Sequence, residues 1–287
     1  MDIKNIKKNL CIIEIENSSY CNRRCSYCSN FYIQREKDNV LLPEDLYRKV
    51  IDELSYMEYE REVTFHRYNE PFWNQNEYIL DRISYAKKML PKAMLETSTN
   101  GDYLDEEYLK RIEKTGLKKL FIQCHMEDFE LVDRNEIHRR ILEVNNRIGK
   151  FKGKFFDNYK KSVFVIINSK FETLSIQAEN FKYEGFTRGE IVQNLIKKDI
   201  EGPCYQPLIS MTIDYNGNVT LCSNTLSYYQ KHVEYVLGNI REKSLEEIYN
   251  SSRAIAYRKK LLDGNREWIC KHCYGCYKNR AKKNEII

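Results

Sequence analysis

The sequence predicts an α/β fold in which a parallel sheet is followed by a smaller unit built from a β-hairpin and helices. Between residue 9 and about residue 170, short apolar runs alternate with amphipathic stretches, a pattern typical of β/α units. At Glu201-Gly-Pro-Cys204 this alternation ends, and an Asn-Gly pair then separates two short runs. A chain of 287 residues can hold one large and one small domain. We expect these domains at residues 1–200 and 201–287.

The predicted strands are short runs rich in β-branched and other apolar residues. We expect them at residues 10–15, 63–66, 93–97, 120–123 and 162–167, with a sixth near Ile176 or Phe186. Because amphipathic stretches separate them, we expect the strands to run parallel in one sheet.

The helices between these strands are predicted from their apolar faces and their end residues. A helix that begins at Pro43 should bury four residues on one face, and the next helix should end before Pro91. Asp105 and Gly116 predict the two ends of a third helix, and residues 135–148 predict a fourth. The four buried positions of the first helix are Leu46, Val50, Ile51 and Leu54.

Polar residues follow four of the predicted strands. They are a cysteine loop after the first strand and then Arg67-Tyr-Asn-Glu-Pro71, Ser98-Thr-Asn-Gly101 and Gln123-Cys-His125. In parallel β/α folds the active site forms at the carboxyl ends of the strands. The four loops should therefore meet at one edge of the sheet.

Composition excludes several classes of protein. Apolar residues make up 42% and charged residues 31% of the chain, with a net charge of +5, which is ordinary for a globular protein rather than a disordered or membrane protein. Residues 1–8 lack the apolar core of a signal peptide. Ten cysteines without a secretion signal indicate metal or redox chemistry in the cytoplasm. The basic stretch at residues 278–283 is interpreted as a solvated terminus, so we expect no nucleic-acid partner and no membrane.

The first cysteine group is Cys21-Asn-Arg-Arg-Cys25-Ser-Tyr-Cys28. Three thiolates on one loop can bind three irons of a cubane cluster and leave the fourth iron open. The alternative is a zinc knuckle or a chance cluster. Zinc sites usually close with a fourth ligand at short range, and the nearest histidine, His66, is far away in sequence.

The second cysteine group is Cys204, Cys222, Cys270, Cys273 and Cys276. The Asn216-Gly217 pair predicts a hairpin before Cys222, and Ser244-Leu-Glu-Glu247 predicts a capping box that opens a helix. The hairpin and helix could bring four thiolates together. Spacing alone does not distinguish an iron–sulfur cluster from tetrahedral zinc.

The spacing of the first group, with Tyr27 before the last cysteine, resembles the signature of the radical S-adenosylmethionine (radical SAM) enzymes. The resemblance implies a partial (β/α)6 barrel in which Cys21, Cys25 and Cys28 hold a 4Fe–4S cluster. It also implies that the open iron binds SAM and that an electron cleaves SAM to a 5′-deoxyadenosyl radical.

The same resemblance implies residues that bind SAM. Tyr68-Asn69-Glu70-Pro71 is similar to the family's Gly-Gly-Glu-Pro element, with both glycines replaced, and Glu70 would contact the amino group of SAM. Tyr27 would lie against the adenine, Thr99 lies in a turn that many members share, and Gln123 would face the ribose or the substrate. Arg139 or Arg140, of which we favour Arg140, would meet the SAM carboxylate.

The second group resembles the SPASM/twitch extensions of radical SAM enzymes, which hold auxiliary iron–sulfur clusters. The shorter twitch version implies one auxiliary 4Fe–4S cluster, and we expect Cys204, Cys222, Cys270 and Cys273 as its ligands. Cys276 is then an alternative ligand, a bystander or a hydrogen-atom donor. Sulfatase-maturing relatives have an acidic residue after the cysteine equivalent to Cys222. Here Ser223 stands there, which leaves Asp214 and Glu201 as candidate bases.

These expectations lead to a radical SAM oxidoreductase that removes a hydrogen atom from a small molecule or peptide. Oxidation, as dehydrogenation or cross-linking with the auxiliary cluster as electron acceptor, is the favoured outcome. The first alternative is an epimerase in which Cys276 returns a hydrogen atom, and the second is a non-enzymatic iron–sulfur or zinc protein. A flavodoxin or ferredoxin should supply electrons. No leader-peptide-binding domain is evident at the N-terminus, which favours a small molecule such as a sugar or cyclitol.

Overall fold

A computed structural model describes residues 2–35, 39–124, 133–158, 161–167, 169–179, 187–193 and 199–273. Its strands are β1 (Ile12–Ile15), β2 (Glu62–Thr64), β3 (Met94–Thr99), β4 (Lys119–Gln123), β5 (Gly153–Asp157), β6 (Lys161–Ile166), β7 (Thr173–Glu179), β8 (Ser210–Ile213), β9 (Asn218–Thr220) and β10 (Val236–Asn239). Its α-helices are α1 (Ile6–Asn9), α2 (Ser29–Tyr32), α3 (Glu44–Tyr56), α4 (Glu77–Met89), α5 (Glu106–Lys114), α6 (Arg134–Ile148), α8 (Gln206–Ile209), α9 (Leu245–Tyr249) and α10 (Ser252–Leu262).

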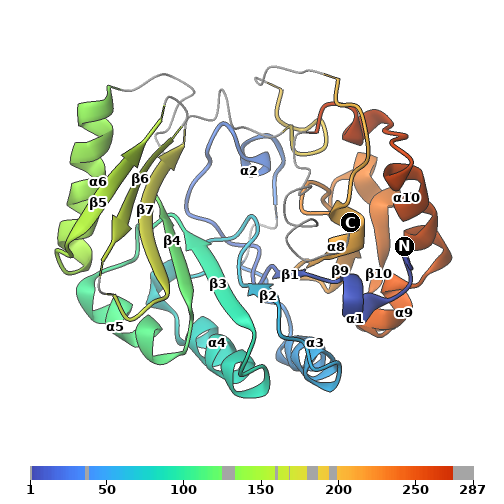
Figure 1. The fold of residues 1–287 in the computed structure, drawn as a ribbon, viewed down its shortest axis with the longest axis horizontal. Coiled ribbons are helices and arrows are strands. Elements are labelled where there is room, and N and C mark those ends of the chain that lie inside the picture. The colour runs from blue at the N-terminus through green and yellow to red at the C-terminus, as the bar shows by residue number, and fades with distance from the viewer. Residues whose placement is uncertain are drawn as a thin grey trace.

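The strands of the described residues form one sheet in the order β10-β9-β8-β1-β2-β3-β4-β7-β6-β5. The central strands, from β8 through β4 to β7, run parallel to one another. Figure 1 shows the sheet curved into an open barrel, with α3, α4, α5 and α6 on its outer side. This confirms the predicted α/β class with a partial parallel barrel.

The helices that cover the parallel strands match their predicted faces and ends. Helix α3 buries Leu46, Val50, Ile51 and Leu54 as expected, and α4 ends at Met89, before Pro91. The side chain of Asp105 accepts a hydrogen bond from the backbone N–H of Tyr108 at 2.7 Å and so caps α5. Local sequence therefore sets these helices, and their apolar faces fix them against the sheet.

The prediction for residues 162–167 is wrong in strand direction. Strand β6 runs antiparallel to both β5 and β7, and β7 is the strand that pairs in parallel with β4. The links from β5 to β6 and from β6 to β7 are only a few residues long. A parallel crossover needs a dozen or more residues, so these links permit only hairpins.

The C-terminal unit extends the same sheet instead of forming a separate one. Strand β8 pairs in parallel with β1 from Ile12↔Ser210 to Ile15↔Ile213, and β8 and β9 form the predicted hairpin. The predicted capping box at Ser244 and Glu247 is also present. The division at residues 200 and 201 stays a proposal, because backbone pairing joins the two parts.

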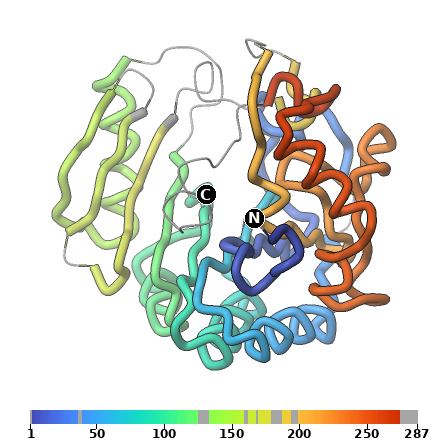
Figure 2. Tube along the Cα trace, turned by 45° about the vertical axis from the view of Figure 1, so that its right-hand side comes forward, coloured from blue at the N-terminus to red at the C-terminus, as the bar shows by residue number. Residues whose placement is uncertain are grey.

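The two ends of the sheet lie far apart in space. Figure 2 shows the green and yellow segment of β5 to β7 on one side and the orange and red C-terminal segment on the other. Across the part of the chain that the structure describes, we find no helix with the length and apolarity that a membrane span requires.

Gly217 should be indispensable to the hairpin, because it has a φ of +82° and an added Cβ would lie 3.1–3.2 Å from Asn239, Ile240 and Leu46. We expect Gly217→Ala to lower the free energy of unfolding by about 2–3 kcal/mol, combining backbone strain and crowding. Gly202 is the matched control, because its φ is +84° but nothing lies within 4 Å of its added Cβ. Gly202→Ala should cost about 1 kcal/mol, from backbone strain alone. Denaturant unfolding measures both, and equal losses would contradict the role of crowding.

Candidate active site

A cavity of about 260 Å³ lies at the carboxyl ends of β1 to β4. It is lined by residues from all four of the predicted strand-end loops. Every predicted residue of the first site except Arg140 lines it: Cys21, Cys25, Tyr27, Cys28, Tyr68, Asn69, Glu70, Thr99 and Gln123. The convergence expected from parallel topology is therefore observed.

The cysteine loop is fixed to the turn that follows β3. Asp102 accepts hydrogen bonds from Arg23 Nε at 2.8 Å and from Asn22 Nδ2 at 2.7 Å, and Asn100 Nδ2 donates to Asn22 Oδ1 at 2.7 Å. Burial raises the pKa of Cys21 to about 12. A free thiol there holds its proton at neutral pH, so binding an iron–sulfur cluster must displace that proton.

Glu70 is a buried carboxylate held by three donors. Its Oε1 accepts from the Thr99 hydroxyl and from the backbone N–H of Phe72 at 3.1 Å, and its Oε2 accepts from the backbone N–H of Asn100 at 2.7 Å. Burial raises the pKa of Glu70 to about 7 against the opposing effect of these bonds. A cationic group bound in the cavity would stabilise the ionised form.

The buried polar atoms of the cavity wall that lack a hydrogen-bond partner among the described residues include one amide donor, Asn69 Nδ2, and one amide acceptor, Gln123 Oε1. Buried polar groups are normally paired, so these two atoms indicate a polar ligand. SAM carries an amino acid and a nucleoside, which offer both kinds of partner. The three thiols and these atoms together fit a SAM-binding cluster site.

Tyr68 makes an additional contact that the sequence did not predict, and Arg140 does not line the cavity. The hydroxyl of Tyr68 donates to the carbonyl of Ser223 at 2.7 Å, and so reaches the segment that carries Cys222. Arg140 lies on α6, where its Nε donates to Glu136 at 2.7 Å, and it is not among the lining residues of the cavity. A role for Arg140 in binding SAM stays a prediction.

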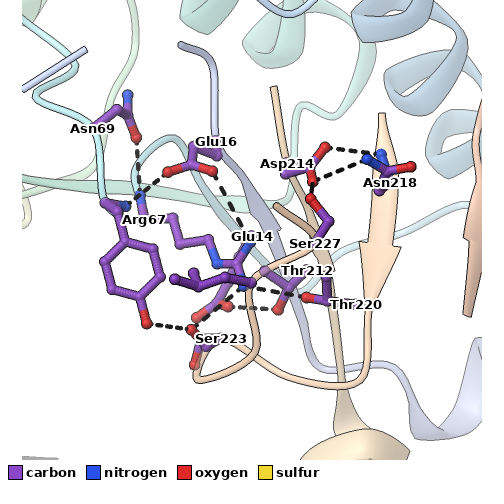
Figure 3. Close-up of polar contacts among 12 residues, drawn as sticks. Glu14, Glu16, Arg67, Asn69, Thr212, Asp214, Asn218, Thr220, Ser223 and Ser227 are labelled. Atoms are coloured by element: carbon purple, nitrogen blue, oxygen red, sulfur yellow. Dashed lines mark hydrogen bonds and ion pairs between the residues drawn. The ribbon is translucent and has the colours of Figure 1, made fainter. Parts of the chain in front are cut away.

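Among the residues that line the cavity, His66, Arg67 and Arg188 were given no role from the sequence. Arg67 lies between Glu16 and the end of β9, where its Nη2 donates to Thr220 Oγ1 at 3.2 Å (Figure 3). The same Nη2 donates to the carbonyl of Thr225. Its position just after a strand could have signalled it. Arg188 follows no recognisable pattern in the sequence, so no such signal existed.

His66 is neutral in this environment. Burial lowers its pKa to about 4, and its Nδ1 accepts a hydrogen bond from the backbone N–H of Ser98 at 3.0 Å. The proton of the ring is therefore on Nε2, where it can be donated to a ligand.

A second, smaller cavity is lined by Cys204, Cys222, Cys270 and Cys273. These are the four expected ligands of the auxiliary cluster, and the hairpin and C-terminal segment bring them together. In a cubane cluster each cysteine binds a different iron, so the four ligands do not surround a single ion. Within the described ranges, no group of three or more Cys, His, Asp or Glu side chains could hold one metal ion. Cys276 lies outside the described residues, and its predicted roles stay untested.

Asp214 does not have the geometry of a base. Its carboxylate is fully buried and accepts from the backbone N–H groups of Asn216 and Asn218 at 2.9 Å, and also from Ser227 (Figure 3). These bonds hold the turn between β8 and β9. The expectation that Asp214 replaces the acidic residue missing at Ser223 is therefore not supported, and Glu201 is solvent-exposed.

A family model described as the radical SAM superfamily matches residues 15–168, which is more than half of the chain, so the protein belongs to this superfamily. A second model, SPASM, described as an iron–sulfur cluster-binding domain, matches residues 204–274. The protein is therefore a radical SAM enzyme whose cofactors are SAM and 4Fe–4S clusters. Both family resemblances inferred from the sequence are confirmed, and a non-enzymatic role is set aside.

The chain is similar to S-adenosyl-L-methionine-dependent 2-deoxy-scyllo-inosamine dehydrogenase from Niallia circulans, with 26% identity over 91% of this chain and 92% of the relative. It shares a fold with BtrN in complex with AdoMet and 2-DOIA, at 22% identity over 93% of each chain and a TM-score of 0.69. It also shares a fold with anSMEcpe with bound AdoMet, at 12% identity over 96% of this chain and 92% of that chain and a TM-score of 0.54.

Iron content should distinguish the two cysteine sites. In anaerobically reconstituted protein, replacing Cys21, Cys25 and Cys28 together by Ala should reduce iron from roughly eight to about four per chain. Cys273→Ala should reduce the iron of the second site, whereas Cys276→Ala should keep it. Metal and sulfide analysis measures these changes. Zinc at the second site, or full iron in Cys273→Ala, would contradict the assignment.

Glu70→Gln should weaken SAM binding roughly tenfold to a hundredfold, because a hydrogen bond to a charged group contributes about 1.5–3 kcal/mol. Anaerobic calorimetry with SAM measures the affinity. Thr99→Val is the control, because it removes one donor to Glu70 and leaves the carboxylate in place. Equal losses in the two variants would show that the charge of Glu70 is not what binds SAM.

Proposed function

We propose that this protein is a radical SAM dehydrogenase that oxidises a hydroxyl-bearing carbon of a small cyclic polyol or aminocyclitol. Two facts support the reaction: the relative from Niallia circulans is named a dehydrogenase, and the two chains align over nearly their whole lengths. The observation that carries the proposal is the contact between the wall of the first cavity and the segment that follows Cys222. Tyr68 and Arg67 make it by donating to the carbonyls of Ser223 and Thr225.

In this proposal, Cys21, Cys25 and Cys28 hold the SAM-binding cluster. When bound, SAM and this cluster supply 5′-deoxyadenosyl radical chemistry, which removes a hydrogen atom from carbon. Glu70 binds the amino group of SAM, with Thr99 and the Asn100 N–H fixing the carboxylate. Tyr27 lies against the adenine, and Asn69 and Gln123 supply the unpaired donor and acceptor of the cavity wall.

Dehydrogenation of an alcohol carbon removes two hydrogens. One leaves as the abstracted atom, and the other leaves as a proton and an electron. Cys204, Cys222, Cys270 and Cys273 hold the acceptor for that electron in this proposal. The carbonyl that Tyr68 contacts belongs to Ser223, which follows Cys222 in the chain, and Cys222 lines their cavity.

Hydrogen-bond donors at the cavity wall support a hydroxylated substrate. His66 presents an Nε2 proton, and Arg67 and Arg188 present guanidinium groups at its wall. Such donors can bind the hydroxyl oxygens of a polyol. A buried donor that a substrate hydroxyl satisfies also excludes analogues that lack this hydroxyl.

The remaining parts of the proposal concern the surroundings of the enzyme. We propose a flavodoxin or ferredoxin as the source of electrons and the reducing cytoplasm as the location. The epimerase alternative depends on Cys276 as hydrogen-atom donor, and nothing in the described residues favours it.

The reaction can be tested with 2-deoxy-scyllo-inosamine, the compound in the name of the relative. With dithionite and SAM, the enzyme should form 5′-deoxyadenosine and a ketone. Substrate deuterium should enter 5′-deoxyadenosine, and solvent deuterium should not enter the product at carbon. Mass spectrometry measures both labels. Solvent deuterium at the reacting carbon would instead indicate epimerisation, and SAM cleavage without any product would exclude this substrate.

A further inference from the structure

A chain of hydrogen bonds leads from the first cavity to a cysteine of the second. Arg188 lines the first cavity, and its Nη1 donates to Oδ1 of Asn224 at 3.2 Å. Asn224 is buried in the wall of the second cavity, and its Nδ2 donates to Sγ of Cys273 at 3.3 Å. Asn224 therefore connects a residue of the first cavity to a sulfur of the second.

The chemistry of the partners fixes the orientation of this amide. A guanidinium group has donors only, so the oxygen of Asn224 must face Arg188. The amide nitrogen then faces Cys273. The direction of the N–H···S bond is therefore a consequence of the arginine, and not an arbitrary choice between two similar atoms.

The backbone around Arg188 is held in an unfavourable conformation. Arg188, Gly189 and Glu190 all have positive φ, at +48°, +65° and +70°, which costs about 1–2 kcal/mol for a residue with a side chain. His232 Nε2 bonds to the carbonyl of Gly189 at 2.8 Å, and His272 Nδ1 pairs with Glu190 at 3.1 Å. These contacts fix the segment against the second cysteine group, so the position of Arg188 is set from that side.

Gly189 shows how close the approach is. A Cβ at this position would lie 2.8 Å from the carbonyl oxygen of Asn224 and 2.7 Å from the ring of His232. Only glycine permits this contact, and the contact places the neighbouring Arg188 within reach of the Asn224 side chain.

We propose that Arg188 and Asn224 form a relay that raises the reduction potential of the auxiliary cluster and couples it to the substrate cavity. The inference rests on the proposed function, in which Cys222 and Cys273 are ligands. Hydrogen bonds to cluster sulfurs stabilise the reduced state, which carries more negative charge. The guanidinium polarises the amide and strengthens this effect. Arg188 and Asn224 are thus positioning residues for electron acceptance.

The relay gives the two cavities a physical connection. If a substrate oxygen accepts a hydrogen bond from Arg188, the guanidinium of Arg188 then donates both to the substrate and to Asn224. Substrate binding and cluster reduction then influence each other by the same free energy in both directions. An acceptor that responds to the occupied cavity is suited to take one electron from a substrate radical formed there.

The test is an EPR-monitored redox titration of the auxiliary cluster in full-length protein. The Cys21→Ala, Cys25→Ala, Cys28→Ala background removes the signal of the other cluster. Asn224→Ala should shift the potential downward, and Arg188→Gln should shift it downward less, because the amide still donates. Asn224→Asp should also shift the potential downward. This variant keeps an oxygen that accepts from Arg188, so it replaces Asn224→Ala in the test if Asn224→Ala does not hold the cluster.

Gln206 supplies the matched control. It is buried, it lines the same cavity, and its Nε2 donates to Ser210 Oγ at 2.8 Å instead of to a sulfur. Gln206→Ala removes an amide, and Gln206→Glu replaces an amide by a carboxylate. These are the same chemical changes as in Asn224→Ala and Asn224→Asp, in the wall of the same cavity. Shifts in the Asn224 variants no larger than those in the Gln206 variants would overturn the relay. The titration uses neither SAM nor substrate, so failure to oxidise 2-deoxy-scyllo-inosamine would leave this result unaffected.

Discussion

The buried carboxylate of Glu16 holds together the loops from which the first site is built. Its Oε1 accepts from Arg35 Nη2 at 2.8 Å and from the backbone N–H of Tyr68 at 3.1 Å, and its Oε2 lies 4.0 Å from Arg67 Nη1. All three charged side chains are at most 2% exposed. Removing one member of a buried charge group typically costs about 3–5 kcal/mol, because another charge stays buried and unpaired. If Glu16 were removed, Arg35 and Arg67 would each be left as a buried charge without its carboxylate partner.

This arrangement explains how the Tyr68-Asn69-Glu70-Pro71 loop keeps its conformation without the two glycines of the family element. The backbone of Tyr68 is held on both sides, by Glu16 at its N–H and by Arg35 and Asn30 at its carbonyl. Neither Tyr68 nor Asn69 has a positive φ, so the conformation does not require glycine. The side chain of Tyr68 is then free to reach Ser223 beside the second cysteine group. The substitution thus joins the two sites at no backbone cost.

Local signals in the sequence predicted much of the fold and of the site, whereas properties that depend on distant partners could not be predicted. Asp105, the Asn216-Gly217 turn and the Ser244 capping box act within a few residues, so their roles are readable from sequence. The direction of β6 depends on its partners, and β5, with which β6 forms a hairpin, was not predicted from the sequence. The role of Arg188 depends on Asn224 and on a turn pinned by two distant histidines, and no local pattern encodes such contacts.

The pairing of β8 with β1 has a consequence for electron transfer between the two parts. The first cysteine group follows β1, and Cys222 lies just beyond β9, the hairpin partner of β8. The first group and Cys222 are therefore attached to two strands of one sheet, β1 and β9, with β8 between them. Thr212 on β8 donates to Glu14 on β1 at 2.7 Å. Backbone ladders of this kind hold their strands about 4.7–4.9 Å apart. Strands of one sheet, rather than a linker, therefore connect the first cysteine group to Cys222. In the proposed reaction, this rigid connection limits how far the electron acceptor can move from the substrate cavity.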